Sequence, residues 1–321
     1  MSDRPGAAGT DPPYDSPALL TRAAGIDFQN PLLLASGTAA YGRELAEVMD
    51  LDRLGGLVTK AVSLEPRQGA PAPRVAEFEG GMINAVGLAN PGVEEVKATE
   101  LPWLARELRR ARVIVNVIGL TVEDFGDVVA RLDDSPGVHA YELNVSCPNT
   151  RAGGLEFGAD RAALTAVVSR ARAATRRPLF VKLSPTLPDI GATARCAVDA
   201  GADGISVVNT LPGLVIDLAT RRPALGFGSG GVSGPGLRPV GVLATWKVRK
   251  AVPVPIIGLG GIGSSEHVLQ YIIAGASLVA VGTAALANPR LPERIVRDLA
   301  AWCALHDVQR LADLVGTLEW S

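Results

Sequence analysis

The chain has 321 residues, of which 47% are hydrophobic and 20% are charged, a composition that can bury a large core and argues against disorder. Its 31 Lys and Arg residues nearly balance its 33 Asp and Glu residues, giving a formal net charge of −2. We therefore expect neither a nucleic acid nor an anionic membrane as a partner, since both require a basic surface. Aromatic residues make up only 4%, which argues against a stacking platform for single strands.

The cysteines and the N-terminal sequence indicate a cytoplasmic protein. The three cysteines, Cys147, Cys196 and Cys303, cannot form an even disulfide framework, and none lies in a CxxC metal motif. They are also too few for a four-cysteine iron–sulfur cluster, so we expect no metal in this chain. No apolar signal-peptide core is present in residues 1–24. Residues 267–289 carry no charge, but glycine and polar residues interrupt them, so we expect a buried helix and strand there rather than a membrane span.

Beyond a flexible N-terminal arm at residues 1–20, short apolar runs alternate with helical patterns. The apolar runs predict strands at residues 32–36, 57–60, 113–117, 140–145, 179–183, 204–209, 254–259 and 278–281. The main helical patterns cover residues 93–110, 121–132, 160–174, 187–200 and 240–250. Strands that are apolar almost throughout are typical of parallel sheets buried on both faces. Eight such strands alternating with helices predict an α/β fold, a single-domain (β/α)8 TIM barrel over residues 21–321.

Long connections follow the second, fourth and sixth predicted strands. Residues 61–92 and 211–239 are rich in glycine and proline, and the loop after the fourth strand contains Gly153 and Gly154. All three begin at the carboxyl ends of strands, where barrel enzymes build their active sites. Loops of this length in a compact domain usually carry function.

Polar side chains stand at the carboxyl ends of the first six strands. The series is Ser36, Lys60, Asn116, Asn144, Lys182 and Asn209. A single polar strand end is expected of any strand, because the strand must emerge into water, but a ring of amides and lysines is not. Amides pair with carbonyl and ring N–H groups and lysines with negative charge, so the series predicts a site for a flat, polar, anionic ligand.

Glycines follow the last two strands. The segment from Gly258 to Gly263 matches the pattern G-x-G-x-x-G, but the acidic ribose ligand of a dinucleotide fold is missing from the strand that follows. In a barrel, the loops after the seventh and eighth strands commonly bind one phosphate through backbone N–H groups. We therefore assign a phosphate site to the following residues: Gly260, Gly261, Gly282 and Thr283.

Cys147 lies in the sequence Asn144-Val-Ser-Cys147-Pro148-Asn149, just beyond the fourth strand. Cys196 and Cys303 fall inside helical patterns, where an inert buried thiol is the simplest interpretation. The loop position of Cys147 suits a proton acceptor, provided that its pKa is modestly tuned. No histidine lies near it in sequence with the pattern of a Cys–His hydrolase.

Several motifs together resemble the dihydroorotate dehydrogenase family over residues 22–315. They are Thr59-Lys60, Leu64-Glu65-Pro66-Arg67-Gln68-Gly69, Asn84-Ala-Val-Gly87-Leu88-x-Asn90-Pro91-Gly92, Asn144-Val-Ser-Cys147-Pro148-Asn149, Val208-Asn209-Thr210 and Gly230-Gly231-Val-Ser233-Gly234-Pro235. A cysteine rather than a serine at position 147 resembles class 1. The run Val215-Ile-Asp217-Leu-Ala-Thr220-Arg is similar to class 1B, the catalytic subunit that pairs with an electron-transfer subunit.

The resemblance implies oxidation of (S)-dihydroorotate to orotate in de novo pyrimidine (UMP) biosynthesis, with FMN in this chain and with FAD and a [2Fe-2S] cluster in the partner. It also implies a homodimeric core that forms a heterotetramer with that partner. Cys147 would be the general base, and Lys60 and Lys182 would assist catalysis. The implied FMN-binding residues are Ser36, Lys60, Ala61, Asn116, Asn144, Lys182, Val208, Gly234, Gly260, Gly261, Gly282 and Thr283. The implied substrate-binding residues are Lys60, Asn84, Ala85, Val86, Gly87, Leu88, Asn144, Asn209 and Thr210.

Three alternatives remain open at this point. The first is an FMN barrel that acts on another pyrimidine, as in dihydropyrimidine dehydrogenases. The second is a flavin-free barrel that binds or isomerises a sugar phosphate. The third, a non-enzymatic binding barrel, is disfavoured by the lysines at the strand ends and the cysteine in the loop. The sequence also leaves the electron acceptor open between NAD+ and fumarate.

Overall fold

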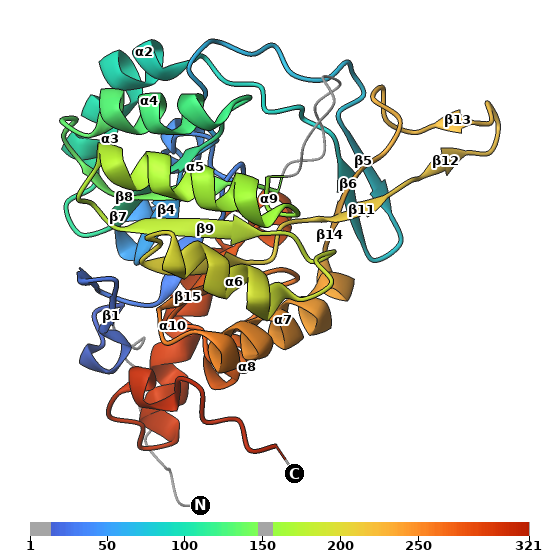
Figure 1. Ribbon diagram of the computed structural model, residues 1–321. Coiled ribbons are helices and arrows are strands. Elements are labelled where there is room, and N and C mark those ends of the chain that lie inside the picture. Colours follow the sequence, from blue (N-terminus) through green and yellow to red (C-terminus); the bar gives the residue numbers. More distant parts are fainter. Residues whose placement is uncertain (1–13, 147–156, 321) are drawn as a thin grey trace, which may run out of the picture.

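The computed structural model describes residues 14–146 and 157–320, and it confirms the predicted barrel. Eight parallel strands close on themselves in the order β10-β15-β16-β3-β4-β7-β8-β9, with helices around the outside (Figure 1). The barrel strands are β3 (Leu32–Leu34), β4 (Gly56–Val58), β7 (Arg112–Val117), β8 (Val138–Asn144), β9 (Leu179–Leu183), β10 (Gly204–Val207), β15 (Ile256–Leu259) and β16 (Leu278–Val281). The helices are α1 (Arg43–Ala46), α2 (Val93–Glu95), α3 (Leu101–Glu107), α4 (Val122–Leu132), α5 (Arg161–Ala174), α6 (Ile190–Asp199), α7 (Arg238–Ala251), α8 (Ser265–Ala274), α9 (Thr283–Ala287) and α10 (Leu291–Leu305).

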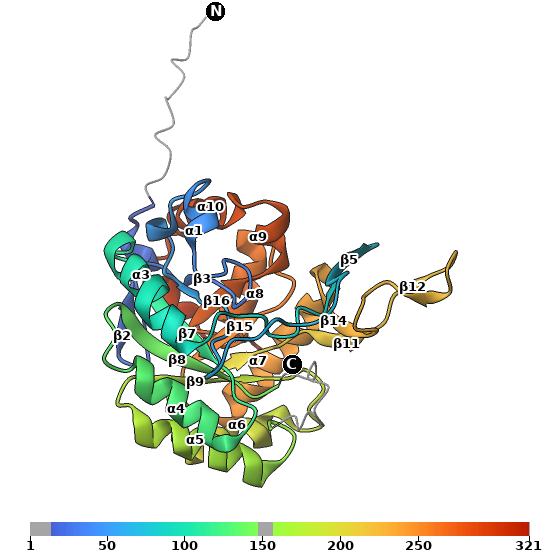
Figure 2. The ribbon, with the colours of Figure 1, turned by 90° about the horizontal axis from the view of Figure 1, so that it is seen from above.

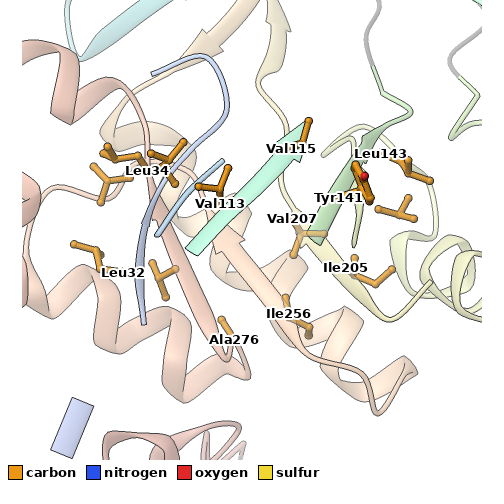
Figure 3. Close-up of a cluster of buried hydrophobic side chains, with 14 of the residues drawn as sticks. Leu32, Leu34, Val113, Val115, Tyr141, Leu143, Ile205, Val207, Ile256 and Ala276 are labelled. Carbon is orange, nitrogen blue, oxygen red and sulfur yellow. The ribbon is translucent and has the colours of Figure 1, made fainter. Parts of the chain in front are cut away.

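The barrel strands are apolar throughout because both of their faces are covered. Alternate residues such as Val113, Val115 and Ile205 face outward and pack in one continuous core with the helices (Figure 3). The residues between them, among them Ile114 and Phe180, form a second core inside the barrel. This arrangement is the reason that the strands read as continuous apolar runs rather than as alternating patterns.

Side-chain caps begin several of the outer helices. Thr121 and Asp124 form a capping box at the start of α4, in which each side chain accepts a hydrogen bond from the other residue's backbone N–H. Helices α5, α6 and α8 are capped by Asp160, Asp189 and Ser264, respectively. Each of these side chains accepts a hydrogen bond from the backbone N–H of the residue three positions later. These caps lie directly after loops, so they fix where each strand-to-helix connection ends.

Several predicted boundaries differ from the structure, and two of the differences bear on the helix pattern and on the site. The helix expected over residues 93–110 is divided into α2, a wider π-type turn η3 (Val96–Glu100) and α3. Pro102 accounts for the division. It has no N–H to donate to the carbonyl of Ala98, four residues earlier, and its ring clashes with that carbonyl. The second and sixth strands end at Val58 and Val207, so Lys60 and Asn209 lie in the loops just beyond them.

The long connections after β4 and β10 meet in a second sheet that projects from the barrel (Figure 2). This projecting sheet is antiparallel, with the order β11-β14-β6-β5. Its strands are β5 (Val75–Phe78), β6 (Gly81–Asn84), β11 (Leu211–Gly213) and β14 (Gly230–Ser233), and it carries the small ribbon β12 (Ile216–Asp217) with β13 (Arg222–Pro223). The loop after β8 lies largely outside the described residues.

The opposite end of the barrel is closed by a hairpin of β1 (Thr21–Ala23) and β2 (Ile26–Phe28). Its Ala23 and Phe28 are both 1% exposed and pack into the core inside the barrel. Among the described residues, no helix is long and apolar enough to cross a membrane.

Candidate active site at the carboxyl ends of the barrel strands

Four polar side chains on the neighbouring strands β7, β8, β9 and β10 form a buried layer inside the barrel, near the carboxyl ends of the strands. They are Asn116, Glu142, Lys182 and Ser206, each at most 5% exposed. Asn116 Nδ2 donates a 2.6 Å hydrogen bond to Glu142 Oε1, and Lys182 Nζ lies 3.9 Å from the same oxygen. Ser206 pairs with Lys182 in the register of β9 and β10. We call these four residues the inner polar layer.

Two atoms of the inner polar layer have no hydrogen-bond partner in the described part of the chain. They are Asn116 Oδ1 and Ser206 Oγ. Leaving a buried polar atom without a partner costs about 1–3 kcal/mol, so such atoms usually mark a ligand site. Asn116 is also held from behind, because its backbone N–H donates to Thr59 Oγ1 at 3.2 Å. The free carbonyl oxygen therefore belongs to a side chain whose position is fixed.

A second group of amides lies beside the inner polar layer. Asn209 Nδ2 donates to Ser146 Oγ at 2.8 Å and to Asn144 Oδ1 at 3.3 Å. Its own Oδ1 accepts from the backbone N–H of Thr210 at 2.9 Å. Asn144 pairs with Lys182 in the register of β8 and β9, so this amide group continues the inner polar layer toward solvent. The structure thus brings together Asn144 and Asn209, which are 65 positions apart in sequence.

The projecting sheet adds Asn84 and Thr210 through the backbone of Gly231. Asn84 Nδ2 donates to Gly231 O at 3.2 Å, and the two residues are partners in the pairing of β6 with β14. A Cβ atom at position 231 would lie only 2.0 Å from Thr210 Oγ1, so glycine is required for this approach. Residues 84–88 continue from the end of β6, and Gly87 and Leu88 both have positive φ angles, of 70° and 60°.

Lys60 stands between the barrel and the projecting sheet. Its backbone N–H donates to Ala40 O at 2.8 Å, which fixes the start of the loop. The pKa of its ammonium group is lowered, chiefly by burial and then by the positive charge of Arg74, while Glu44 acts in the opposite direction. The backbone carbonyl of Arg74 in turn accepts a hydrogen bond from the N–H of Ala85, which ties Arg74 to the segment of residues 84–88.

The glycine-rich loops lie on the other side of the barrel opening. Gly261 has a φ of 65°, and a Cβ atom there would come within 2.7 Å of Arg238 N and 2.8 Å of Gly234 O. The loops after β14 and β15 therefore touch backbone to backbone. Thr283 Oγ1 donates to Ser233 Oγ at 2.7 Å, which ties in the loop after β16. These contacts bring Gly234, Gly261 and Thr283 into one cradle, to which Gly261 and Thr283 of the predicted phosphate site belong.

The first glycine of the G-x-G-x-x-G pattern has a packing role. A Cβ atom at Gly258 would overlap the Tyr271 ring at 2.4 Å. The Tyr271 hydroxyl donates to Gly260 O at 2.7 Å and so holds the loop. Gly282, after β16, has more room than Gly258, because the nearest atoms to a Cβ there would be 3.8 Å away, at Ala35 and Thr38.

The remaining predicted residues divide into two sets. Ala61 is buried next to Lys60 in the loop after β4, and Val208 is buried next to Asn209 in the loop after β10. Ser36 is partly exposed just beyond β3. Cys147 lies outside the described residues, as do Gly153 and Gly154, so their predicted roles are not tested by the geometry.

Sequence reasoning missed four polar residues that the structure places among these groups: Glu142, Ser146, Ser206 and Ser233. The alternation of the strands could have found two of them. Glu142 has the same inward parity as the strand-end residue Asn144, and both Glu142 and Ser206 interrupt apolar runs.

Two surface hollows lie elsewhere on the molecule. One of about 720 Å³ is lined by residues that include Tyr14, Trp103 and Arg290, and one of about 510 Å³ lies between α5 and α6 beside Cys196. Neither is lined by a predicted site residue. The convergent polar groups, rather than hollow size, therefore locate the site. Within the described part of the chain, no group of three or more His, Cys, Asp or Glu side chains could hold a metal ion.

Comparison with known proteins agrees with the motifs. A family profile described as dihydroorotate dehydrogenase matches residues 18–302. The chain belongs to this family. A relative from Pelobacter propionicus, named dihydroorotate dehydrogenase B (NAD(+)), catalytic subunit, is 46% identical over 303 residues, which are 94% of this chain and 99% of the relative. A relative of the same name from Desulforudis audaxviator is 47% identical, covering 91% of this chain and 95% of its own. A relative from Solibacter usitatus, named as putative dihydroorotate dehydrogenase A (fumarate), is also 47% identical, covering 95% of this chain and 100% of the relative.

The residues at this end of the barrel fit the FMN that the family resemblance implies. The unpaired Asn116 Oδ1 offers a buried acceptor for a ring N–H group, and the buried Lys182 offers positive charge for an electron-rich ring edge. The cradle around Gly261, Gly282 and Thr283 is accessible to a phosphate, since a Cβ atom at position 282 would meet no atom closer than 3.8 Å. The inner polar layer and this cradle lie at the same end of the barrel, as a cofactor with a ring at one end and a phosphate at the other requires.

Proposed function

We propose that this protein oxidises (S)-dihydroorotate to orotate in pyrimidine biosynthesis, with FMN bound at the carboxyl ends of the barrel strands. The observation that carries the proposal is the inner polar layer together with the adjoining amides of Asn144 and Asn209. A carboxylated ring with an imide-like edge needs convergent amides and a cation, and the site supplies both. Membership of the dihydroorotate dehydrogenase family supports the same reaction.

The roles of the side chains follow from their chemistry. Asn84, Asn144, Asn209 and Thr210 bind the polar edge of the substrate, and residues 84–88 cover it. Cys147 accepts the proton from C5 of the substrate, as its place after Asn144 in the sequence suits a base. FMN, when bound, supplies at N5 the acceptor for the hydride from C6.

The two lysines contribute positive charge at different places. Lys60 lies in the loop after β4 and binds the anionic substrate next to the cofactor. Lys182 is buried in the inner polar layer and stabilises the negative charge that reduction places on the N1–C2=O edge of a flavin. The phosphate is held by the cradle of Gly234, Gly260, Gly261, Gly282 and Thr283.

The protein is proposed to work as the class 1B catalytic subunit, in a homodimeric core that forms a heterotetramer with an electron-transfer subunit carrying FAD and a [2Fe-2S] cluster. The relatives named as catalytic subunits of the NAD(+) type support this assignment. The three cysteines of the chain are too few to hold such a cluster, which supports placing it in a partner. Electrons would then reach NAD+ in the cytoplasm, with residues 21–321 as the FMN-binding unit.

An absorption spectrum recorded before and after adding dihydroorotate tests the reaction. We expect yellow protein that is bleached by dihydroorotate and not by dihydrouracil. Bleaching by dihydrouracil instead would indicate a barrel for another pyrimidine, and colourless protein that does not take up FMN would indicate a flavin-free phosphate-binding barrel. Reoxidation by fumarate, or by NAD+ without an added partner, would contradict the class 1B assignment.

A further inference from the structure

Glu142 and Lys182 are the only charged residues that are buried among the described residues. Glu142 is 1% exposed and Lys182 is 5% exposed, so neither charge is solvated by water. A buried charge requires a partner or a function, because its transfer out of water is costly. The separation of 3.9 Å between Lys182 Nζ and Glu142 Oε1 makes the two charges counter-ions at contact distance.

Glu142 also holds Asn116, and the direction of that contact matters. The 2.6 Å bond from Asn116 Nδ2 to Glu142 Oε1 uses the amide NH2 group and turns the carbonyl oxygen, Asn116 Oδ1, away as the atom without a partner. One carboxylate oxygen thus orients the free acceptor of Asn116 and lies at contact distance from the Lys182 ammonium. No other carboxylate of the described residues reaches either side chain by a hydrogen bond or an ion pair.

We propose that Glu142 is a positioning residue for the bound flavin, which orients the free carbonyl of Asn116 and offsets the charge of Lys182, and thereby sets the reduction potential of the flavin. This inference rests on the proposed function. Reduction adds negative charge to the flavin, so a carboxylate beside Lys182 opposes reduction while the ammonium favours it. The charge of Glu142 therefore determines how much of the positive charge of Lys182 acts on the cofactor.

The test is the midpoint potential of the bound flavin in Glu142→Gln, measured by titration against a reference dye. Glutamine has the same shape and retains an oxygen that can accept from Asn116, but it carries no charge. We expect the ratio of reduced to oxidised flavin at a fixed potential to rise at least tenfold, which is an upward shift of about 30 mV for a two-electron couple. Lys182→Gln should shift the potential in the opposite direction, and in the double variant this ratio should return to within threefold of that in the unmodified protein.

Two further variants make the test decisive. Glu94→Gln is the matched control, since Glu94 is exposed and pairs with Arg131 on the outside of the barrel, so the potential should not change. Glu142→Asp keeps the charge, and we expect it to bind FMN with a ratio of reduced to oxidised flavin within threefold of that in the unmodified protein.

The outcomes separate the inference from the proposed function. Failure of the unmodified protein to bind FMN would overturn the proposed function. FMN binding with an unchanged potential in Glu142→Gln would overturn the inference alone. If Glu142→Gln cannot hold FMN, retention of FMN by Glu142→Asp would support a need for the charge. Loss of folding in both variants, seen by circular dichroism, would show a purely structural role and overturn the inference.

Discussion

The barrel interior and the projecting sheet contribute to the site in different ways. Inside the barrel, Asn116, Glu142 and Lys182 lie on adjacent strands, are nearly fully buried and hold one another. In the projecting sheet, Asn84 is only partly buried and depends on pairing between β6 and β14, which come from connections more than a hundred residues apart. A cofactor site suits the first arrangement, because precise placement needs rigid strands. A substrate site suits the second, because substrate and product must enter and leave. Substitutions in the two regions should therefore have separable effects.

The largest expected effect comes from neither region but from the loop after β8. Cys147→Ala should lower kcat for dihydroorotate oxidation by about 10²–10⁴-fold, since removal of a general base has that consequence. FMN should remain bound, with its yellow colour unchanged. Stopped-flow reduction of the flavin measures the effect directly. Loss of the colour in this variant would mean that Cys147 serves the cofactor site rather than the proton transfer.

Gly261→Ala tests the cradle on the barrel side. The new Cβ atom would meet backbone at Arg238 and Gly234, and the φ of 65° is unfavourable for alanine, at a cost of about 1–3 kcal/mol. We expect the Kd of FMN to rise by about 5- to 150-fold. Gly236→Ala is the matched control, because a Cβ atom there has nothing within 4 Å and its φ is not positive. Equal FMN affinities in the two variants would contradict the cradle.

Asn84→Ala tests the projecting sheet. It removes a side chain that donates to Gly231 O and that we assign to the substrate, so KM for dihydroorotate should rise about tenfold, from the loss of a hydrogen bond worth about 1.5 kcal/mol. The Kd of FMN should not change. Steady-state kinetics and an FMN titration on the same sample separate the two quantities. A weaker affinity for FMN with an unchanged KM would reverse the assignment of the two regions.

The smallest expected effect concerns the pH dependence of substrate binding at Lys60. Burial and Arg74 lower the pKa of Lys60, so its charge, and with it the affinity for the anionic orotate, is lost as pH rises through a value below the ordinary one. Arg74→Gln removes the like charge, so the loss of orotate affinity at alkaline pH (the alkaline limb) should move to higher pH by less than one pH unit. Orotate titrations at several pH values measure the shift. Arg74→Lys keeps the charge and should leave the limb in place; an equal shift in both variants would show that loop geometry, not charge, is responsible.

The same pKa shift has a consequence for stability. The pKa of Lys60 is lower in the folded state than in the unfolded state, so the charged lysine lowers the free energy of unfolding. This destabilisation is complete at low pH, where Lys60 is fully charged. It disappears as pH rises from the lowered pKa toward the ordinary lysine value. Lys60→Met should therefore stabilise the FMN-free protein more at neutral pH than at the alkaline end of that range.

The sequence predicted the strands and most strand-end residues because these are local signals. Lys182 and Asn116 each lie within or directly after apolar runs, and the adjacent Gly260 and Gly261 follow another such run, where paired glycines are typical of a phosphate loop. The contact of Asn84 with Gly231 could not be predicted in the same way, because it depends on the register between two distant loops. Glu142 was missed for a different reason. A single carboxylate inside an apolar run gives no indication of its counter-ion, which lies on the next strand in the barrel.

The hairpin at the opposite end of the barrel gives the molecule a direction. Phe28 and Ala23 fill that end from within, so the hairpin closes the interior on this side. Under the proposed function, dihydroorotate and orotate would therefore share a single entrance, and the two would compete for it. Any subunit that collects the electrons would have to dock around this entrance without sealing it. Catalysis would then alternate between an exchange of small molecules and a transfer of charge.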